Sequence, residues 1–263
     1  MNGPPPAGEP ISSEAGQALI RLAAEAAAAG DFDKAIAAQR QAAEMAGHLF
    51  GDDSLQKATA NVNLGSLYLR AQRPGDAFDS YRDGLERLFA QGMASDAHGG
   101  ALENLLESGL QAGRPRETGQ ALLTLAKHAK AWPGAINLAK LAAMAFVTAE
   151  LLPPALDAFE VALACQASLD PAEARKWATP IMGMAAGLAQ SLKEPERTEL
   201  AALVTRFAAT ATKGGWSDAV LGTPRWAELM ADLALPQESG AATPPAAERD
   251  TKGGFLRRLF GSR

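Results

Sequence analysis

The sequence predicts an all-α protein built as a solenoid of antiparallel helix pairs, and three observations support this prediction. Apolar residues make up 47% of the 263 residues but aromatic residues only 6%, and this balance suits helices that pack closely through small side chains. Alanine, the strongest helix former, recurs in interrupted runs such as residues 23–29. No segment alternates polar and apolar residues and β-branched residues do not cluster, so strands are not expected.

The chain divides into a helical body with contrasting ends. Residues 1–12 are rich in proline and glycine and are predicted to be disordered. Residues 13–235 alternate helical patterns with short breaks and form the predicted repeat domain. Residues 236–252 form a polar linker with two adjacent prolines, and residues 253–263 a short amphipathic and basic terminal motif.

The clearest repeat unit covers residues 58–91. Two antiparallel helices can nest only where small residues lie at their crossing and large residues fill the space beside it. We expect Gly65, Ala77 and Gly84 to be the small contacts and the two tyrosines to be the fillers. The residues that define the unit are Leu64, Gly65, Tyr68, Ala77, Tyr81 and Gly84.

The same frame recurs along the chain. Units are predicted near residues 16–49, 58–91, 99–132 and 136–169, followed by degenerate C-terminal helices within residues 171–235. Those last helices, at 171–192, 195–212 and 224–235, each begin at or near a proline, which suits a first helical turn. Their tryptophans are expected to fill a closing cap: Trp177, Trp216 and Trp226. The second-helix anchors of the four units, spaced by 42, 41 and 37 residues, are Ala35, Ala77, Thr118 and Ala155.

These residues resemble the tetratricopeptide repeat family, in which Leu-Gly and an aromatic residue mark the first helix and a small–aromatic–small pattern marks the second. The connection at residues 49–68, LFGDDSLQKATANVNLGSLY, is similar to the long-repeat variant of kinesin light chains, and the resemblance covers residues 16–165. It implies a right-handed superhelix whose first helices line a concave groove for a peptide or a partner protein.

The resemblance also implies which side chains face that groove. Asn63 and Asn104 occupy the same repeat position, where an amide can both donate to and accept from the backbone of an extended peptide. The alternative is that these asparagines cap or bridge neighbouring helices. The full predicted set is Arg21, Asn63, Ser66, Arg70, Asn104, Glu107, Lys140 and Met144.

Charge and reactive residues favour a binding protein. The net charge of −5 argues against nucleic-acid binding by bulk electrostatics. Cys165 is the only cysteine and lies in an apolar helical stretch, so a buried thiol is expected. Because the three histidines are isolated and no nucleotide-binding or catalytic motif is present, we expect no metal, no cofactor and no catalytic residue.

The terminal motif is the second predicted site. On a helix its four apolar residues would share one face, with both arginines opposite, but six residues cannot hold a helix alone in water. The motif could therefore contact a partner or a membrane surface, fold back on its own body, or do nothing. Two arginines would give only weak membrane contact. Its residues are Phe255, Leu256, Arg257, Arg258, Leu259 and Phe260.

The sequence thus predicts a non-catalytic interaction scaffold or adaptor that binds a protein partner, with the terminal motif serving recruitment or localisation. The alternative is a peripheral membrane adaptor anchored by that motif. Residues 1–10 lack the basic and apolar segments of a secretory signal, and residues 138–152 are too short and too charged to span a bilayer. A cytoplasmic location is therefore expected.

Overall fold

The computed structural model describes residues 13–129 and 131–234, and this part of the chain contains helices but no strand. The predicted all-α solenoid of antiparallel helix pairs is confirmed. The α-helices are α1 (Ser13–Ala28), α2 (Phe32–Phe50), α3 (Leu55–Arg70), α4 (Pro74–Ala90), α5 (Gly99–Gln111), α6 (Pro115–His128), α7 (Ala135–Thr148), α8 (Leu152–Ala167), α9 (Pro171–Lys176), α10 (Ala178–Ser191), α11 (Glu196–Lys213) and α12 (Pro224–Ala234), with 3₁₀ turns η1 (Asp96–His98) and η2 (Ser217–Ala219).

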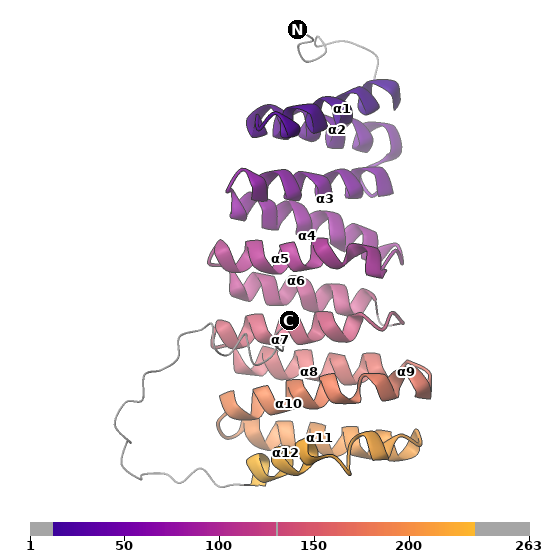
Figure 1. The fold of residues 1–263 in the computed structure, drawn as a ribbon, viewed down its shortest axis with the longest axis vertical. Coiled ribbons are helices and arrows are strands. Elements are labelled where there is room, and N and C mark those ends of the chain that lie inside the picture. The colour runs from indigo at the N-terminus through magenta and orange to yellow at the C-terminus, as the bar shows by residue number, and fades with distance from the viewer. Residues whose placement is uncertain (1–12, 130, 235–263) are drawn as a thin grey trace, which may run out of the picture.

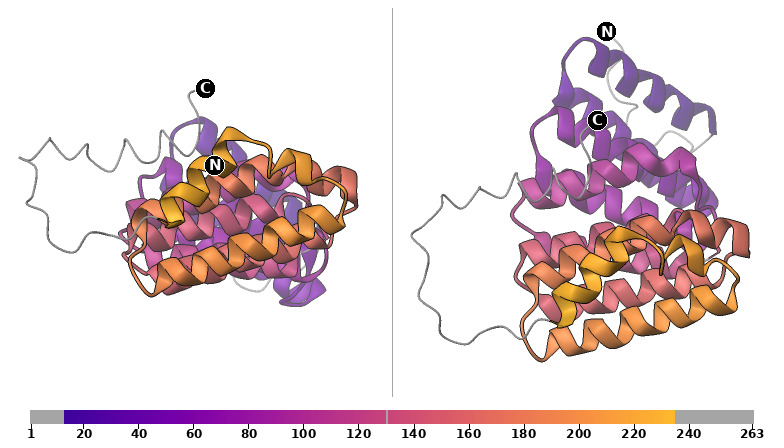
Figure 2. Two further views of the ribbon diagram at one scale, coloured as in Figure 1. Left: turned by 90° about the horizontal axis from the view of Figure 1, so that it is seen from below. Right: turned by 60° about the horizontal axis from the view of Figure 1, so that its bottom comes forward.

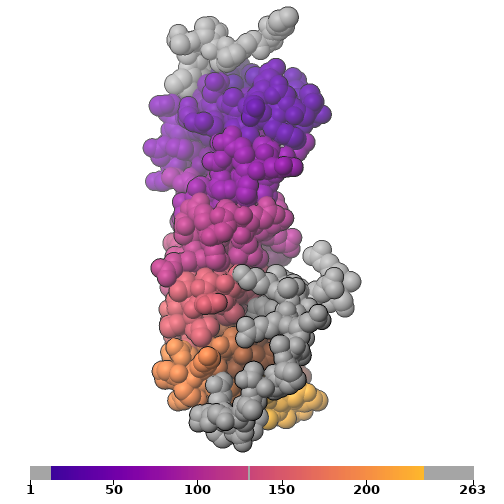
Figure 3. Space-filling view, turned by 90° about the vertical axis from the view of Figure 1, so that its left-hand side faces the viewer, coloured from indigo at the N-terminus to yellow at the C-terminus, as the bar shows by residue number. Residues whose placement is uncertain are grey.

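The helices form two layers. Each helix packs against its chain neighbour within a pair, while α3, α5, α7 and α10 contact one another in one layer and α4, α6, α8 and α11 in the other. Figure 1 shows the pairs stacked along the long axis, from α1–α2 at one end to α11 and α12 at the other. The space-filling view in Figure 3 shows the same stack as an elongated body.

Small residues lie where the helices of a pair cross. The four predicted second-helix anchors are all fully buried. A Cβ added at Gly65 would lie 2.8 Å from the ring of Tyr81, and one added at Gly84 would lie 2.7 Å from the backbone oxygen of Ala58. Since real Cβ contacts are almost never that short, both glycines are required for the close packing of α3 on α4.

In the third pair, different residues lie where the two helices cross. Thr118 replaces the small anchor, and its hydroxyl donates to the carbonyl oxygen of Arg114 over 2.8 Å, which satisfies it in the core. Gly109 takes the position that Tyr68 has in the second pair, and Phe78 from α4 packs against it. An aromatic side chain is thus supplied from the preceding pair.

The turns between the two helices of the first four pairs all have the same backbone conformation. The second residue after the first helix adopts a left-handed φ, which is +79° at Gly30, +58° at Gln72, +70° at Gly113 and +58° at Glu150. The next backbone N–H then donates to a carbonyl five residues earlier, for example from Arg73 to Tyr68 over 2.9 Å. This is the Schellman arrangement, which ends a helix and starts its partner within a few residues.

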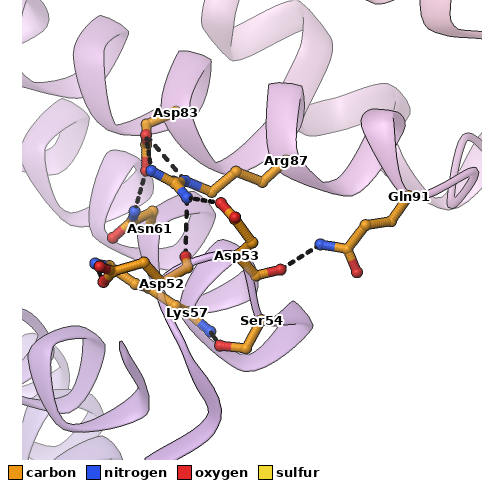
Figure 4. Close-up of polar contacts among 8 residues, drawn as sticks. All are labelled: Asp52, Asp53, Ser54, Lys57, Asn61, Asp83, Arg87 and Gln91. Carbon is orange, nitrogen blue, oxygen red and sulfur yellow. Dashed lines mark hydrogen bonds and ion pairs between the residues drawn. The ribbon is translucent and has the colours of Figure 1, made fainter. Parts of the chain in front are cut away.

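Polar contacts fix the connection between the first two pairs (Figure 4). Arg87 on α4 donates to both carboxylate oxygens of Asp83, to the carbonyl oxygen of Asp52 and, over 2.6 Å, to the carboxylate of Asp53. Asn61 on α3 donates to Asp83 as well, so one carboxylate joins both helices of the pair. Ser54 caps α3 by accepting from the backbone N–H of Lys57. These contacts therefore attach the predicted long connection to the second pair, α3 and α4.

The fifth pair departs from the prediction. A single helix was expected over residues 171–192, but the chain breaks at Trp177 into α9 and α10. The reason is Pro180, which lacks the N–H that would bond to the carbonyl of Lys176 and whose ring clashes with that carbonyl. Beyond α11, α12 lies against the last pair at the end of the stack (Figure 2), with Trp216 almost fully buried against Phe207.

Two further predictions concern the cysteine and membrane-spanning helices. Cys165 is buried, as predicted. Over residues 13–129 and 131–234, none of the helices is both long enough and apolar enough to cross a bilayer. The terminal motif and the linker lie outside the described residues.

Candidate partner-binding groove

A groove of about 1180 Å³ runs along the first-helix layer over the third, fourth and fifth pairs. It is bounded by η1 and α5, by the connection from α6 to α7 with α7 itself, and by α9 with the start of α10. In the superhelical stack, neighbouring first helices contact each other only side by side. Their outer faces therefore remain open along this layer. The groove is large enough for several side chains of a bound peptide.

Apolar side chains form the floor of the groove. On α5 they recur at every fourth residue, as Leu102, Leu106 and Leu110, and therefore lie on one face of the helix. Leu141 and Met144 continue this surface on α7. Burial of apolar side chains of a ligand in this groove would therefore contribute favourably to the free energy of binding.

Two tryptophans flank this floor. Trp132 precedes α7; its indole N–H donates to a carboxylate oxygen of Asp96 over 3.1 Å, and its ring meets the edge of Phe89 at 5.9 Å between centroids. Trp177 lies at the break between α9 and α10 and is half-buried. Rigid aromatic rings of this kind are common anchors in protein interfaces.

The charges of the groove are not evenly placed. Glu103 and Glu107 are exposed on α5, one turn apart, and Asp96 lies just before that helix. On the opposite side Lys176 pairs with Glu173 within α9. The α5 edge of the groove is thus acidic.

Lys140 is the one basic residue of the groove on α7. Burial lowers the pKa of its ammonium group, because the charged form loses contact with water. Its position beside Met144 places a positive charge within the apolar floor. A carboxylate or a carbonyl oxygen of a ligand that reached this depth would relieve the desolvation of that charge.

The structure brings together three of the eight predicted site residues. Glu107, Lys140 and Met144 line the groove. Arg21 and Asn63 are exposed on α1 and α3, outside its lining.

The other three predicted residues make contacts within the fold. Ser66 lies 2.8 Å from the hydroxyl of Tyr81, and Asn104 donates to the same hydroxyl over 3.0 Å. Arg70 donates to the carbonyl oxygen of Ala27 over 3.0 Å and stacks on the ring of Phe32. Asn104 therefore bridges neighbouring pairs, which was the alternative to a groove role at this position.

Sequence reasoning missed the two tryptophans of the groove. Trp132 is the last residue of the predicted unit 99–132, where the repeat frame assigns no groove position. Trp177 was assigned to the closing cap, but the helix break caused by Pro180 places it in the groove lining. A signal was available for the first of them, since Pro133-Gly134 marks a turn and connections of this kind run over the protein surface.

The stacked pairs, with a groove along one layer, define this chain as a helical-repeat protein. The sequence model of the tetratricopeptide repeat family matches residues 14–88, so the first four helices are tetratricopeptide repeats, as the sequence predicted. Repeats of this family mediate protein–protein interactions.

Two solved structures are similar to the chain. Both contain nearly identical tetratricopeptide-like repeats of a Podosopora anserina protein described as a kinesin light chain, one of them carrying a Q17M substitution. Each is 14% identical to this chain; the substituted form covers 75% of this chain and 94% of its own, with a TM-score of 0.39, and the other 78% and 98%, with a TM-score of 0.41. No curated protein sequence gives a significant match.

Proposed function

We propose that this protein is a non-catalytic interaction scaffold whose groove over α5, α7 and α9–α10 binds a segment of a partner protein. The observation that supports this proposal best is the groove itself, with its apolar floor, two tryptophans and an acidic edge. Such a surface favours a partner segment that presents apolar side chains on one side and basic side chains beside them.

Charge reversal on the acidic edge tests this proposal. The full-length double variant Glu103→Lys with Glu107→Lys is compared with the wild type in capture experiments from native lysate. Both glutamates are exposed, so the fold is expected to tolerate the change. We expect the variant to lose the captured partner, because like charges across an interface repel.

A matched control keeps the same change in net charge away from the groove. The double variant Glu44→Lys with Asp157→Lys reverses two exposed acidic residues on second helices, α2 and α8. It should capture the partner as the wild type does. Equal capture by both double variants, or equal loss, would remove the groove from the proposal.

A second element of the proposal is the terminal motif, for which recruitment to a partner or weak membrane contact was predicted. Deletion of residues 236–263 tests it in the same capture experiment, together with sedimentation on vesicles that contain anionic lipid. Loss of vesicle binding with intact partner capture would support a membrane role for the motif. Loss of partner capture would support recruitment through it.

A further inference from the structure

The groove and the terminal motif have complementary chemistry. The groove offers a leucine-lined floor beside an acidic edge at Asp96, Glu103 and Glu107. The sequence at residues 255–260, Phe-Leu-Arg-Arg-Leu-Phe, combines four apolar residues with two arginines and no acid. On the basis of the function proposed above, we propose that the groove binds residues 255–260 of its own chain.

Burial of apolar surface would drive this contact. In a helical turn the four apolar residues of the motif fall on one side, at positions i, i+1, i+4 and i+5. That side matches a floor built from Leu102, Leu106 and Leu110 on α5 and from Leu141 and Met144 on α7. An amphipathic helix that lays its apolar face into a hydrophobic groove is a recurrent mode of peptide recognition.

The charges fix the direction in which the arginines point. The opposite walls of the groove differ in charge, because α7 contributes Lys140 and α9 contributes Lys176 paired with Glu173, whereas all the charged groups from α5 and η1 are acids. Arg257 and Arg258 would therefore face the α5 edge. Trp132, whose ring lies at that edge next to Asp96, adds an aromatic face on which a guanidinium can stack.

The covalent connection is long enough for binding within one chain. Twenty residues, 235–254, separate the end of α12 from the motif, and a chain of that length can span at most roughly 70 Å. α12 packs on α10, a helix of 14 residues, or about 21 Å, whose first turn contributes Pro180 to the groove. The groove therefore lies within reach, and tethering gives an effective concentration on the order of millimolar, so a weak contact suffices.

Competition with a free peptide tests the proposal in the full-length protein. A fluorescent peptide of residues 253–263 is titrated into the wild type and into the double variant Phe255→Ala with Phe260→Ala. If the motif occupies the groove, the variant has an open groove and should bind the peptide about tenfold more tightly than the wild type or better. Equal affinity for the two proteins, or no binding to either, overturns the proposal.

Groove variants show where the peptide binds. Adding Glu103→Lys and Glu107→Lys to the tail variant should weaken peptide binding by at least about threefold. Adding Glu44→Lys and Asp157→Lys instead should leave it unchanged, and thermal melts establish that each protein is folded. Equal effects of the two pairs would overturn the groove as the binding site. Equally tight binding of a peptide in which both phenylalanines are replaced by alanine would also overturn the groove as the binding site.

Sedimentation separates binding within one chain from binding between copies. A wild type that dimerises where the tail variant is monomeric would place the motif in a second copy and overturn the proposal as stated. A crosslinking experiment distinguishes failure of this proposal from failure of the proposed function. A photo-crosslinker at Met144 in the tail variant that captures a partner but not the peptide would leave the proposed function standing alone.

Discussion

The side-chain amide of Asn104 donates a hydrogen bond of 3.0 Å to the hydroxyl of Tyr81, which links α5 to the second helix of the preceding pair. Tyr81 is itself fully buried, and its ring fills the space over Gly65 while its hydroxyl also meets Ser66. One aromatic residue thus connects the packing of a pair to the stacking of two pairs. Two residues predicted to bind a partner are engaged in this connection.

The two asparagines at the same repeat position should therefore behave differently. Replacing the part-buried Asn104 by alanine leaves the hydroxyl of Tyr81 with one partner fewer and should lower the free energy of unfolding by about 1 kcal/mol. Asn63 is exposed on α3, so Asn63→Ala should change it by less than about 0.5 kcal/mol. Urea denaturation of both single variants measures the difference; equal stability would mean that the bridge does not contribute.

Overpacking at the crossing of α3 and α4 is the next test. A Cβ at Gly65 would lie 2.8 Å from the ring of Tyr81, which is held by its hydroxyl and cannot move away easily. Gly65→Leu should therefore destabilise the protein by roughly 1–3 kcal/mol, and Ala77→Leu, at a fully buried anchor, by a similar amount.

Gly75 provides the control for that prediction. It lies in the first turn of α4, where an added Cβ meets nothing within 4 Å. Gly75→Ala should leave the thermal midpoint unchanged or raise it, because alanine loses less backbone entropy than glycine on folding. If all three variants melted like the wild type, the assigned repeat register would be wrong.

The sequence was most informative where the repeat frame and the packing rule agree. Small and aromatic residues in alternation predicted the crossing of α3 and α4, because close approach of two helices leaves few alternatives in residue size. The groove was predicted less well. Its position depends on which first helices keep an apolar outer face, and the predicted groove residues did not include Leu102, Leu106 and Leu110, which line it on α5.

The break at Trp177 shows a second limit of sequence reasoning. The proline at 180 signals either a first helical turn or an interruption, and the periodic pattern of residues 171–192 continues across it. Only the packed structure shows that α9 and α10 separate there and that Trp177 reaches the groove. The hydrogen bonds of Ser66, Arg70 and Asn104 likewise depend on contacts between pairs, which a single repeat does not reveal.

The left-handed turn residues give a stability prediction. Gln72 and Glu150 adopt φ values of +58°, which cost a residue with a side chain about 1–2 kcal/mol relative to glycine. Gln72→Gly and Glu150→Gly should each raise the free energy of unfolding by about 0.5–1 kcal/mol, since part of that gain is offset by the greater entropy of glycine in the unfolded chain. Gly113→Ala, at the equivalent turn of the third pair, should lower it. A decrease on introducing glycine at both positions would contradict this account of the turns.

Lys140 should cost the protein stability at neutral pH. Burial lowers the pKa of its ammonium group in the folded chain, whereas the unfolded chain keeps the ordinary value of 10.5. The folded state therefore binds this proton less tightly, and the full penalty applies at pH values below the lowered pKa. The penalty falls as the pH rises from the lowered pKa towards 10.5, because the folded lysine loses its proton first. Lys140→Met, which replaces the side chain by an uncharged one that is one atom shorter, should raise the urea midpoint at neutral pH, and this advantage should shrink as the pH rises through that window. A midpoint that is unchanged at neutral pH, or an advantage that grows with pH, would show that the charge of Lys140 is well solvated in the groove.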